Sequence, residues 1–186
     1  MTEYLSAYGI ALGSNINKLD PSVRHVHAYN GEASMLGQVN VKRGNGRLAL
    51  FVGRLLKLPP PLSEAEAKIV FKTTGYSEVL TREYGPDRNG QIWIMQSDIE
   101  ADPAAPMMIH ESFGHAKLTL QLHTNHGKLA HEITGVTLFG VPLPKFCWPE
   151  LCATEWQENG RYRFDVCLSL PLAGFIIRYS GWLLPA

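Results

Sequence analysis

Residues 160–184 read GRYRFDVCLSLPLAGFIIRYSGWLL, and their pattern decides the fold class. From Tyr162 to Leu170 apolar and polar side chains alternate, a period of two that is typical of a half-buried strand and not of a helix. Residues 171–174 supply a reversal, and residues 175–184 are rich in the aromatic and branched side chains that favour strands. The stretch therefore predicts two antiparallel strands with one buried face.

The rest of the chain repeats this arrangement of short strands separated by turn signals. Asn89-Gly90 and Asn159-Gly160 are typical of tight hairpin turns, and no helical period is long enough to supply the crossovers of a parallel sheet. We expect one domain over residues 1–186, α+β but mainly β, with an antiparallel meander of about nine or ten strands that forms a barrel or a strongly bent sheet. The other predicted strands cover residues 32–43, 68–73, 77–84, 91–97, 107–113, 117–123, 129–138 and 153–157.

Two helices are predicted outside the strands. A short one begins at Asp20, where an N-cap acceptor precedes Pro21. The main one follows Gly46, has apolar residues at helical spacing opposite cations, and ends before residues 59–61, which are all proline. Such a stripe usually packs against a core, so we expect this amphipathic helix to cover an open face of the sheet. The alternative is a helix lying on anionic lipid headgroups, since apolar side chains beside cations also suit a membrane surface.

Composition limits the classes of function. The chain has 17 Lys and Arg and 17 Asp and Glu residues, so it lacks the overall positive charge expected of a nucleic-acid-binding protein. Its three cysteines include no Cys-x-x-Cys pair, which argues against a disulfide framework or a zinc site. The N-terminus does not resemble a signal peptide, and no apolar run reaches the ~20 residues of a spanning helix. We expect a cytoplasmic protein without a transmembrane segment.

Several segments, taken in order, are similar to one protein family. They are residues 19–24, 31–34, 41–44, 55–60, 141–144, 160–166, 170–174 and 178–183. This order resembles the domain of unknown function 4166 family over nearly the whole chain. In that family the domain often follows a saccharopine-dehydrogenase-like NAD(P)-binding domain, so the resemblance implies a stand-alone version here. It implies no dehydrogenase activity, no cofactor and no catalytic residues.

The seven histidines raise the question of a metal site. His25 and His27 lie two residues apart on the predicted helix and do not share a face, and nothing in the spacing of the others specifies converging ligands. We therefore expect surface or capping roles and no metal. His131 differs because alternation places it on the same strand face as Leu129 and Ile133. There we expect a hydrogen-bonded core histidine in preference to a catalytic base.

A second set of residues suggests a ligand site. Arg178 and Trp182 share a strand face, and an arginine beside a tryptophan ring could hold an anionic head while the ring covers an apolar tail. A solvent-facing ladder of charges is the alternative for this face, and for Arg163 and Asp165. Carboxylates such as Asp98 and Glu100 have no predictable pairing, so a glycosidase is unsupported. The predicted ligand-lining residues are Arg82, His131, Arg178, Tyr179 and Trp182.

Three hypotheses of function follow. The first is a non-enzymatic domain that binds an apolar or amphipathic small molecule between a curved sheet and a basic helix. The second is an interaction module for a dehydrogenase-like protein, with an exposed apolar patch at Pro171, Leu172 and Phe175. The third is an isomerase- or cyclase-like enzyme that uses His131 or Asp165 in an apolar cavity.

Overall fold

The structure is a computed structural model that describes residues 6–29, 31–74 and 76–186. Its strands are β1 (Glu32–Arg43), β2 (Leu62–Thr74), β3 (Ser77–Tyr84), β4 (Trp93–Ala101), β5 (Met108–Phe113), β6 (Ala116–Asn125), β7 (Lys128–Leu138), β8 (Val141–Pro142), β9 (Glu150–Glu158), β10 (Arg161–Leu170) and β11 (Gly174–Pro185). Its helices are α1 (Ala7–Leu12), α2 (Pro21–His27) and α3 (Arg47–Leu55), with 3₁₀ turns η1 (Gly13–Lys18) and η2 (Lys145–Cys147).

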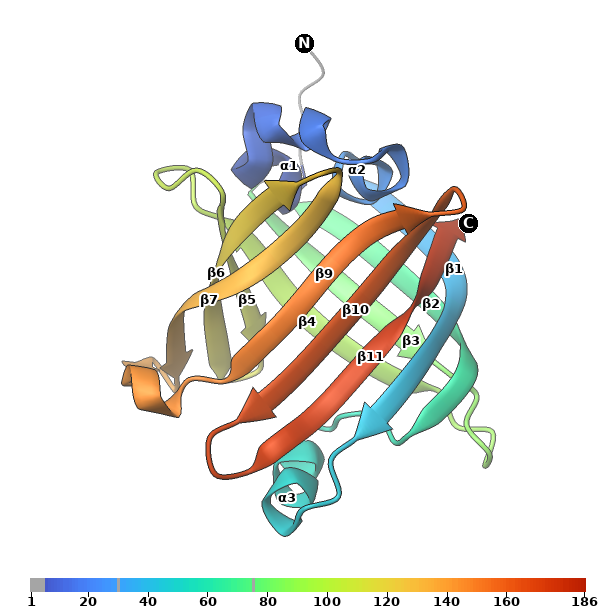
Figure 1. Ribbon diagram of the computed structural model, residues 1–186, viewed down its shortest axis with the longest axis vertical. Helices are drawn as coiled ribbons and strands as arrows, with labels where there is room; N and C mark the ends of the chain where they lie inside the picture. The colour runs from blue at the N-terminus through green and yellow to red at the C-terminus, as the bar shows by residue number, and fades with distance from the viewer. Residues whose placement is uncertain (1–5, 30, 75) are drawn as a thin grey trace.

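The strands form a closed antiparallel barrel (Figure 1). The order β6-β5-β4-β3-β2-β1-β11-β10-β9-β7 is completed by pairing of β6 with β7, so ten strands close the barrel and β8 adds only a short extension beside β7. The pairing of β7 with β9 covers only residues 129–131 and 153–155, at the upper end of the two strands. The prediction of a mainly β meander is confirmed, and of its two alternatives, barrel or bent sheet, the barrel is correct.

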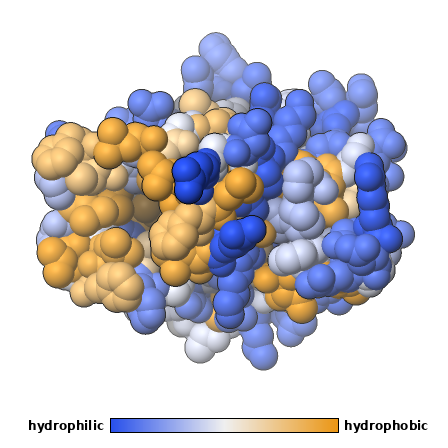
Figure 2. Space-filling view, turned by 90° about the horizontal axis from the view of Figure 1, so that it is seen from below, coloured by the Kyte–Doolittle hydropathy of each residue, from blue (hydrophilic) through white to orange (hydrophobic). Residues whose placement is uncertain are grey.

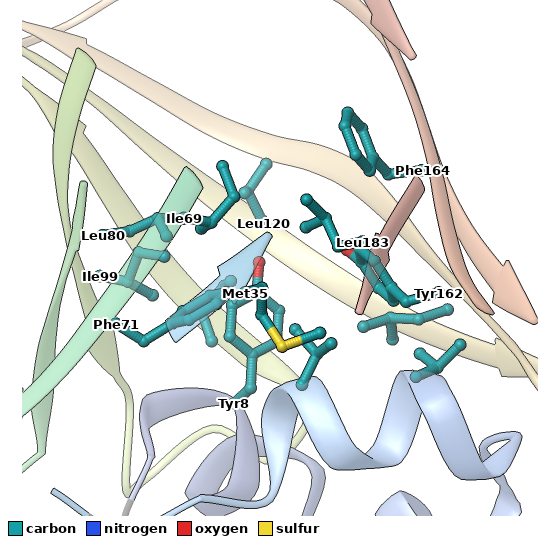
Figure 3. Packing of buried hydrophobic residues seen from close by; sticks show 14 of the residues in the cluster. Tyr8, Met35, Ile69, Phe71, Leu80, Ile99, Leu120, Tyr162, Phe164 and Leu183 are labelled. Carbon is teal, nitrogen blue, oxygen red and sulfur yellow. The ribbon is translucent and has the colours of Figure 1, made fainter. Parts of the chain in front are cut away.

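The N-terminal helices close one end of this barrel, which we call the upper end after its position in Figure 1. Ala7, Ile16 and Val23 have no exposed surface, and the backbone N–H of Asp20 donates to the carbonyl of Gly127 in the β6–β7 turn at 2.9 Å. Figure 3 shows Tyr8 reaching from the N-terminal helices towards Met35, Phe71 and other apolar side chains of the wall. The core therefore extends from these helices into the barrel.

Helix α3 lies at the opposite, lower end, between β1 and β2 (Figure 1). Its leucines and its phenylalanine are exposed, whereas Ala49 and Gly53 are buried and Val52 packs partly against the core. The expectation that its apolar stripe covers an open sheet face is therefore wrong, because the sheet closes on itself and offers no such face.

Other differences from the prediction occur where tertiary contacts override local patterns. The helical segment α1 to η1 was not predicted, because its six-residue pieces depend on packing into the barrel rather than on their own propensity. Strand β2 begins six residues before its predicted start at residue 68, because pairing with β1 continues down to Val41 opposite Leu62. The unassigned segment at residues 146–152 contains η2 and the start of β9.

Candidate ligand-binding interior

The middle and lower parts of the barrel interior are reached by solvent. The register of the strands directs alternate residues inward, and inward-facing side chains of the upper half, such as Ile99, Leu122 and Leu129, are fully buried. Below them some inward-facing side chains, such as Val41, Tyr84 and Ile177, are buried as well, but others are only partly buried. These are Met95, Leu118, Ile133, Leu151, Val166, Leu168 and Tyr179. The exposed area of these inward-facing apolar side chains shows that solvent reaches part of the barrel interior from its lower end.

A buried ionic cluster lies among the inward-facing side chains of β3, β4 and β5. Arg82 on β3 donates to Ser97 Oγ on β4 at 2.9 Å and to Glu111 Oε1 on β5 at 3.0 Å. Ser97 Oγ also donates to Glu111 Oε1 at 2.8 Å, and the Phe113 ring centroid is 5.8 Å from the guanidinium carbon. We call Arg82, Ser97 and Glu111 the Arg82 cluster. Adjacent antiparallel strands place these three inward-facing residues side by side.

The Arg82 cluster carries balanced charge. Burial alone would lower the pKa of Arg82, but the Glu111 carboxylate outweighs it and the pKa lies above its ordinary value. Arg82 is thus a permanent cation beside an anion. Burial also raises the pKa of Tyr179 and Tyr84, and the Arg82 charge offsets only part of that rise, so both phenols remain neutral.

A second polar group lies above, under the N-terminal helices. His27 on α2 forms a short contact with Glu155 Oε2 on β9, and Tyr8 Oη on α1 is 3.0 Å from His131 Nε2 on β7. Glu78 Oε2 accepts from the backbone N–H of Ala7 and from Tyr29 Oη, each at 3.0 Å. These contacts fasten the helices to the wall, which explains why polar side chains are retained in a core.

The pKa values of this second group are shifted in opposite directions. Burial raises the pKa of Glu155, but His27 outweighs it through its charge and its hydrogen bond, and the pKa lies below its ordinary value. Burial lowers the pKa of His131, although the neighbouring Glu155 carboxylate opposes this. Burial raises the pKa of Glu78. Helix α1 covers His131, and its Tyr8 side chain bonds to the imidazole. His131 is therefore a hydrogen-bonded core histidine.

The structure divides the five predicted ligand-lining residues between the two faces of the wall. Arg82, His131 and Tyr179 point inward, whereas Arg178 and Trp182 point outward, because Tyr179 pairs with the buried Val41 and its neighbours in sequence take the opposite face. Arg178 and Trp182 therefore do not line the interior, which corrects the expectation that they share a concavity with the other three.

The outward side chains form surface contacts of their own. Arg178 donates to both carboxylate oxygens of Asp165, through Nε at 2.8 Å and through Nη2. The Arg161 guanidinium carbon lies 4.3 Å from the Trp182 ring centroid. The alternative of a solvent-facing charge ladder describes this face, and Asp165 does not reach the interior.

Sequence reasoning missed most partners of the inward residues. His27 was expected at the surface, but it is buried against Glu155, whose strand is far away in the sequence. Glu78 could have been found, since it alternates with Leu80, Arg82 and Tyr84 on the inward face of β3. Nothing in the sequence pairs Arg82 with Glu111. Among the residues that the structure describes, no group of three or more His, Cys, Asp or Glu side chains could hold a metal ion.

A model of the family described as domain of unknown function DUF4166 matches residues 19–183. The chain belongs to this family. The match spans the DUF4166 barrel except the last two residues of β11, and it begins after α1, so Tyr8 lies outside the matched residues. No curated protein matches the sequence. In the described part of the chain, no helix is both long enough and apolar enough to cross a membrane.

Proposed function

We propose that the barrel binds an amphipathic small molecule, with its apolar part in the lower interior and its polar head at the Arg82 cluster. One observation carries the proposal: apolar side chains that point into the barrel stay partly exposed below a buried arginine. Sites of this kind are mostly apolar with a few polar groups that fix orientation. The interior matches that description.

The head group we propose is polar but uncharged. Arginine has more N–H donors than the bonds to Ser97 and Glu111 use, so a carbonyl or hydroxyl oxygen of a ligand would find donors at Arg82. A carboxylate would also approach the negative charge of Glu111. Because that charge already neutralises Arg82, a second anion in the same low-dielectric space is disfavoured.

Native mass spectrometry of freshly purified protein tests whether a ligand is carried from the cell. A defined probe then tests the head group: Nile red is bound to protein stripped of ligand and displaced at pH 8 by monoolein or by oleate. We expect monoolein to compete at a concentration at least about tenfold lower than oleate. Preferential displacement by oleate would contradict the uncharged head, and the absence of Nile red binding would contradict the site itself.

Two substitutions at neighbouring positions provide a matched control. Val166 points into the barrel, where it is partly exposed, and Cys167 points outward on the same strand. We expect Val166→Trp to fill the interior and abolish Nile red binding, and Cys167→Trp to leave it unchanged. Equal loss in both variants would show that the dye does not bind inside the barrel.

A further inference from the structure

Exposed apolar side chains gather at the lower end of the molecule. Among the described residues, all large exposed apolar side chains except Leu36, Tyr76 and Leu184 belong to α3, to the turns at this end or to the strand ends beside them. Figure 2, a view of this end, shows apolar residues collected on one side with a hollow among them, while the other side is mainly hydrophilic. The residues concerned are Leu48, Leu50, Phe51, Leu55, Leu56, Ile92, Ile94, Leu138, Phe139, Val141, Phe146, Leu172 and Phe175.

Helix α3 packs with its small residues towards the protein and its large apolar residues towards solvent. Leu48, Phe51 and Leu55 are 54%, 63% and 69% exposed, whereas Ala49 is buried. Gly53 lies directly on the Arg43 guanidinium, so close that a Cβ there would be 1.5 Å from Nη2. The close approach at Gly53 fixes this orientation, so the exposed stripe is part of how the helix is attached.

Arg43 holds the helix in this position. Its Nη1 donates to the carbonyls of Leu58 at 3.1 Å and Pro59 at 2.9 Å, just after α3, and its Nε donates to Ile176 at 3.3 Å on β11. The neighbouring β10–β11 turn adds Leu172, which is 99% exposed, and Phe175.

The charged residues of α3 and its flanking segments are of one sign. From Lys42 to Ser63 the sequence has five cationic residues and no acidic one, and from residue 166 to the end there is again no acidic residue. Acidic side chains at the lower end, such as Glu64 and Asp87, line an open recess of about 790 Å³ between residues 61–66 and 86–88. Around α3 itself, apolar side chains that project between cations match a membrane surface that carries anionic headgroups.

We infer that the lower end docks on membranes rich in anionic phospholipid, with Leu48, Phe51, Leu55 and Leu172 entering the headgroup region and Arg47, Arg54 and Lys57 contacting phosphates. Docking would bring the lower end of the barrel, where some inward-facing side chains are partly exposed, against the bilayer. The inference thus rests on and extends the proposed function by supplying a source for its amphipathic ligand. The docking contacts themselves involve only surface residues and need no occupied interior.

Flotation with liposomes tests this docking. Full-length protein is mixed at low salt with vesicles of phosphatidylglycerol and phosphatidylcholine, or of phosphatidylcholine alone. We expect binding to the anionic vesicles to be at least about tenfold stronger and to fall as salt rises. Failure to float with anionic vesicles at low salt would overturn the inference.

Variants separate the contribution of the apolar side chains from that of the cations. Phe51→Ser with Leu55→Ser should weaken binding at least about tenfold, and Arg47→Gln with Arg54→Gln should remove the preference for anionic vesicles. The control Leu36→Ser with Leu184→Ser removes two exposed apolar side chains that pair on the outer wall at the other end, and it should float like wild type. Circular dichroism verifies that each variant is folded.

Two further results would count against membrane docking. If Phe51→Ser with Leu55→Ser instead dissolved a dimer seen by sedimentation, the apolar surface would be an interface between copies of the chain. If the control weakened flotation as much as the α3 variant, the apolar contacts would be non-specific. The Val166→Trp variant separates this inference from the proposed function, since it should still float after losing Nile red binding.

Discussion

The carboxylate of Glu111 lies 3.0 Å from the guanidinium of Arg82, inside the barrel and 29 residues away in the sequence. Both side chains are about nine-tenths buried, and Ser97 bonds to both. A pair of this kind is held in place because either charge alone would be very costly to bury. Its position, beside inward-facing side chains that are only partly buried, makes it both a structural contact and the centre of the proposed ligand site.

Removal of either Arg82 or Glu111 alone should therefore destabilise the fold far more than removal of both. We expect Glu111→Leu to lower the free energy of unfolding by ~3–5 kcal/mol, because Arg82 would keep its charge without a counter-ion. The double variant Arg82→Met with Glu111→Leu should recover most of this loss. Urea unfolding of both variants and of Arg82→Met completes a double-mutant cycle, and additive losses would show that the two charges are not coupled.

The ion pair on the outside should behave differently. Arg178 binds Asp165 through two nitrogens, but the arginine side chain is 49% exposed. Water and salt screen such a pair, so we expect Asp165→Asn to change the free energy of unfolding by about 0–1 kcal/mol. Urea unfolding of the Asp165→Asn variant measures this change. A loss as large as that from Glu111→Leu would mean that burial does not distinguish the two pairs.

Acid should destabilise the fold through His131. Burial lowers the pKa of His131 in the folded state, with Tyr8, His27, Glu111 and Glu155 around it. Below the ordinary histidine pKa of about 6.5, His131 is protonated in the unfolded chain but stays neutral in the folded chain. Stability should therefore fall as pH falls from about 7 to 5, with a contribution approaching ~1.4 kcal/mol per pH unit.

The variant His131→Gln isolates this contribution. We expect its unfolding free energy, measured in urea from pH 7 to 5, to depend less on pH than that of wild type. His123→Gln, at an exposed position, is the matched control and should keep the wild-type slope. Below this range the lowered pKa of Glu155 adds a further loss when that carboxylate takes up a proton, so both variants should still unfold in stronger acid. An unchanged slope in His131→Gln would assign the acid sensitivity to other groups.

Gly53→Ala should destabilise the attachment of α3 although alanine favours helices. The added Cβ would displace the Arg43 guanidinium, which would then lose hydrogen bonds to Leu58 and Pro59. We expect a net loss of ~1 kcal/mol after the gain in helix propensity, and faster tryptic cleavage after Arg54. Gly46→Ala is the control, because the nearest atom to its Cβ would be the Ala173 carbonyl oxygen at 4.0 Å. Equal protection of both variants from trypsin would contradict the role of Arg43.

Much of the barrel was predictable because strands carry a local signal. Alternation from Tyr162 to Leu170 requires only that one face be buried, and it marks β10 correctly. Asn159-Gly160 marks the turn before that strand, since both residues there have positive φ. Such patterns establish that residues share a face. They carry no information about which face is the interior.

The candidate site could be predicted only in part for the same reason. The alternation of side chains along β11 placed Arg178 and Trp182 on one face and Tyr179 on the other. Only closure of the sheet decided that the face of Tyr179 is the interior. Likewise the helical spacing of Leu48, Phe51 and Leu55 indicated an amphipathic α3, yet the close packing of Gly53 on Arg43 turned that stripe outward.

The sequence by itself thus determined the strands, their turns and the antiparallel class, because these follow from side-chain period and from backbone preferences within a few residues. The tertiary structure alone decided that β6 pairs with β7, that Arg82 meets Glu111, and that His27 meets Glu155. These contacts join segments distant in the chain, and they form because a closed barrel has one interior, in which every buried charge must find its partner.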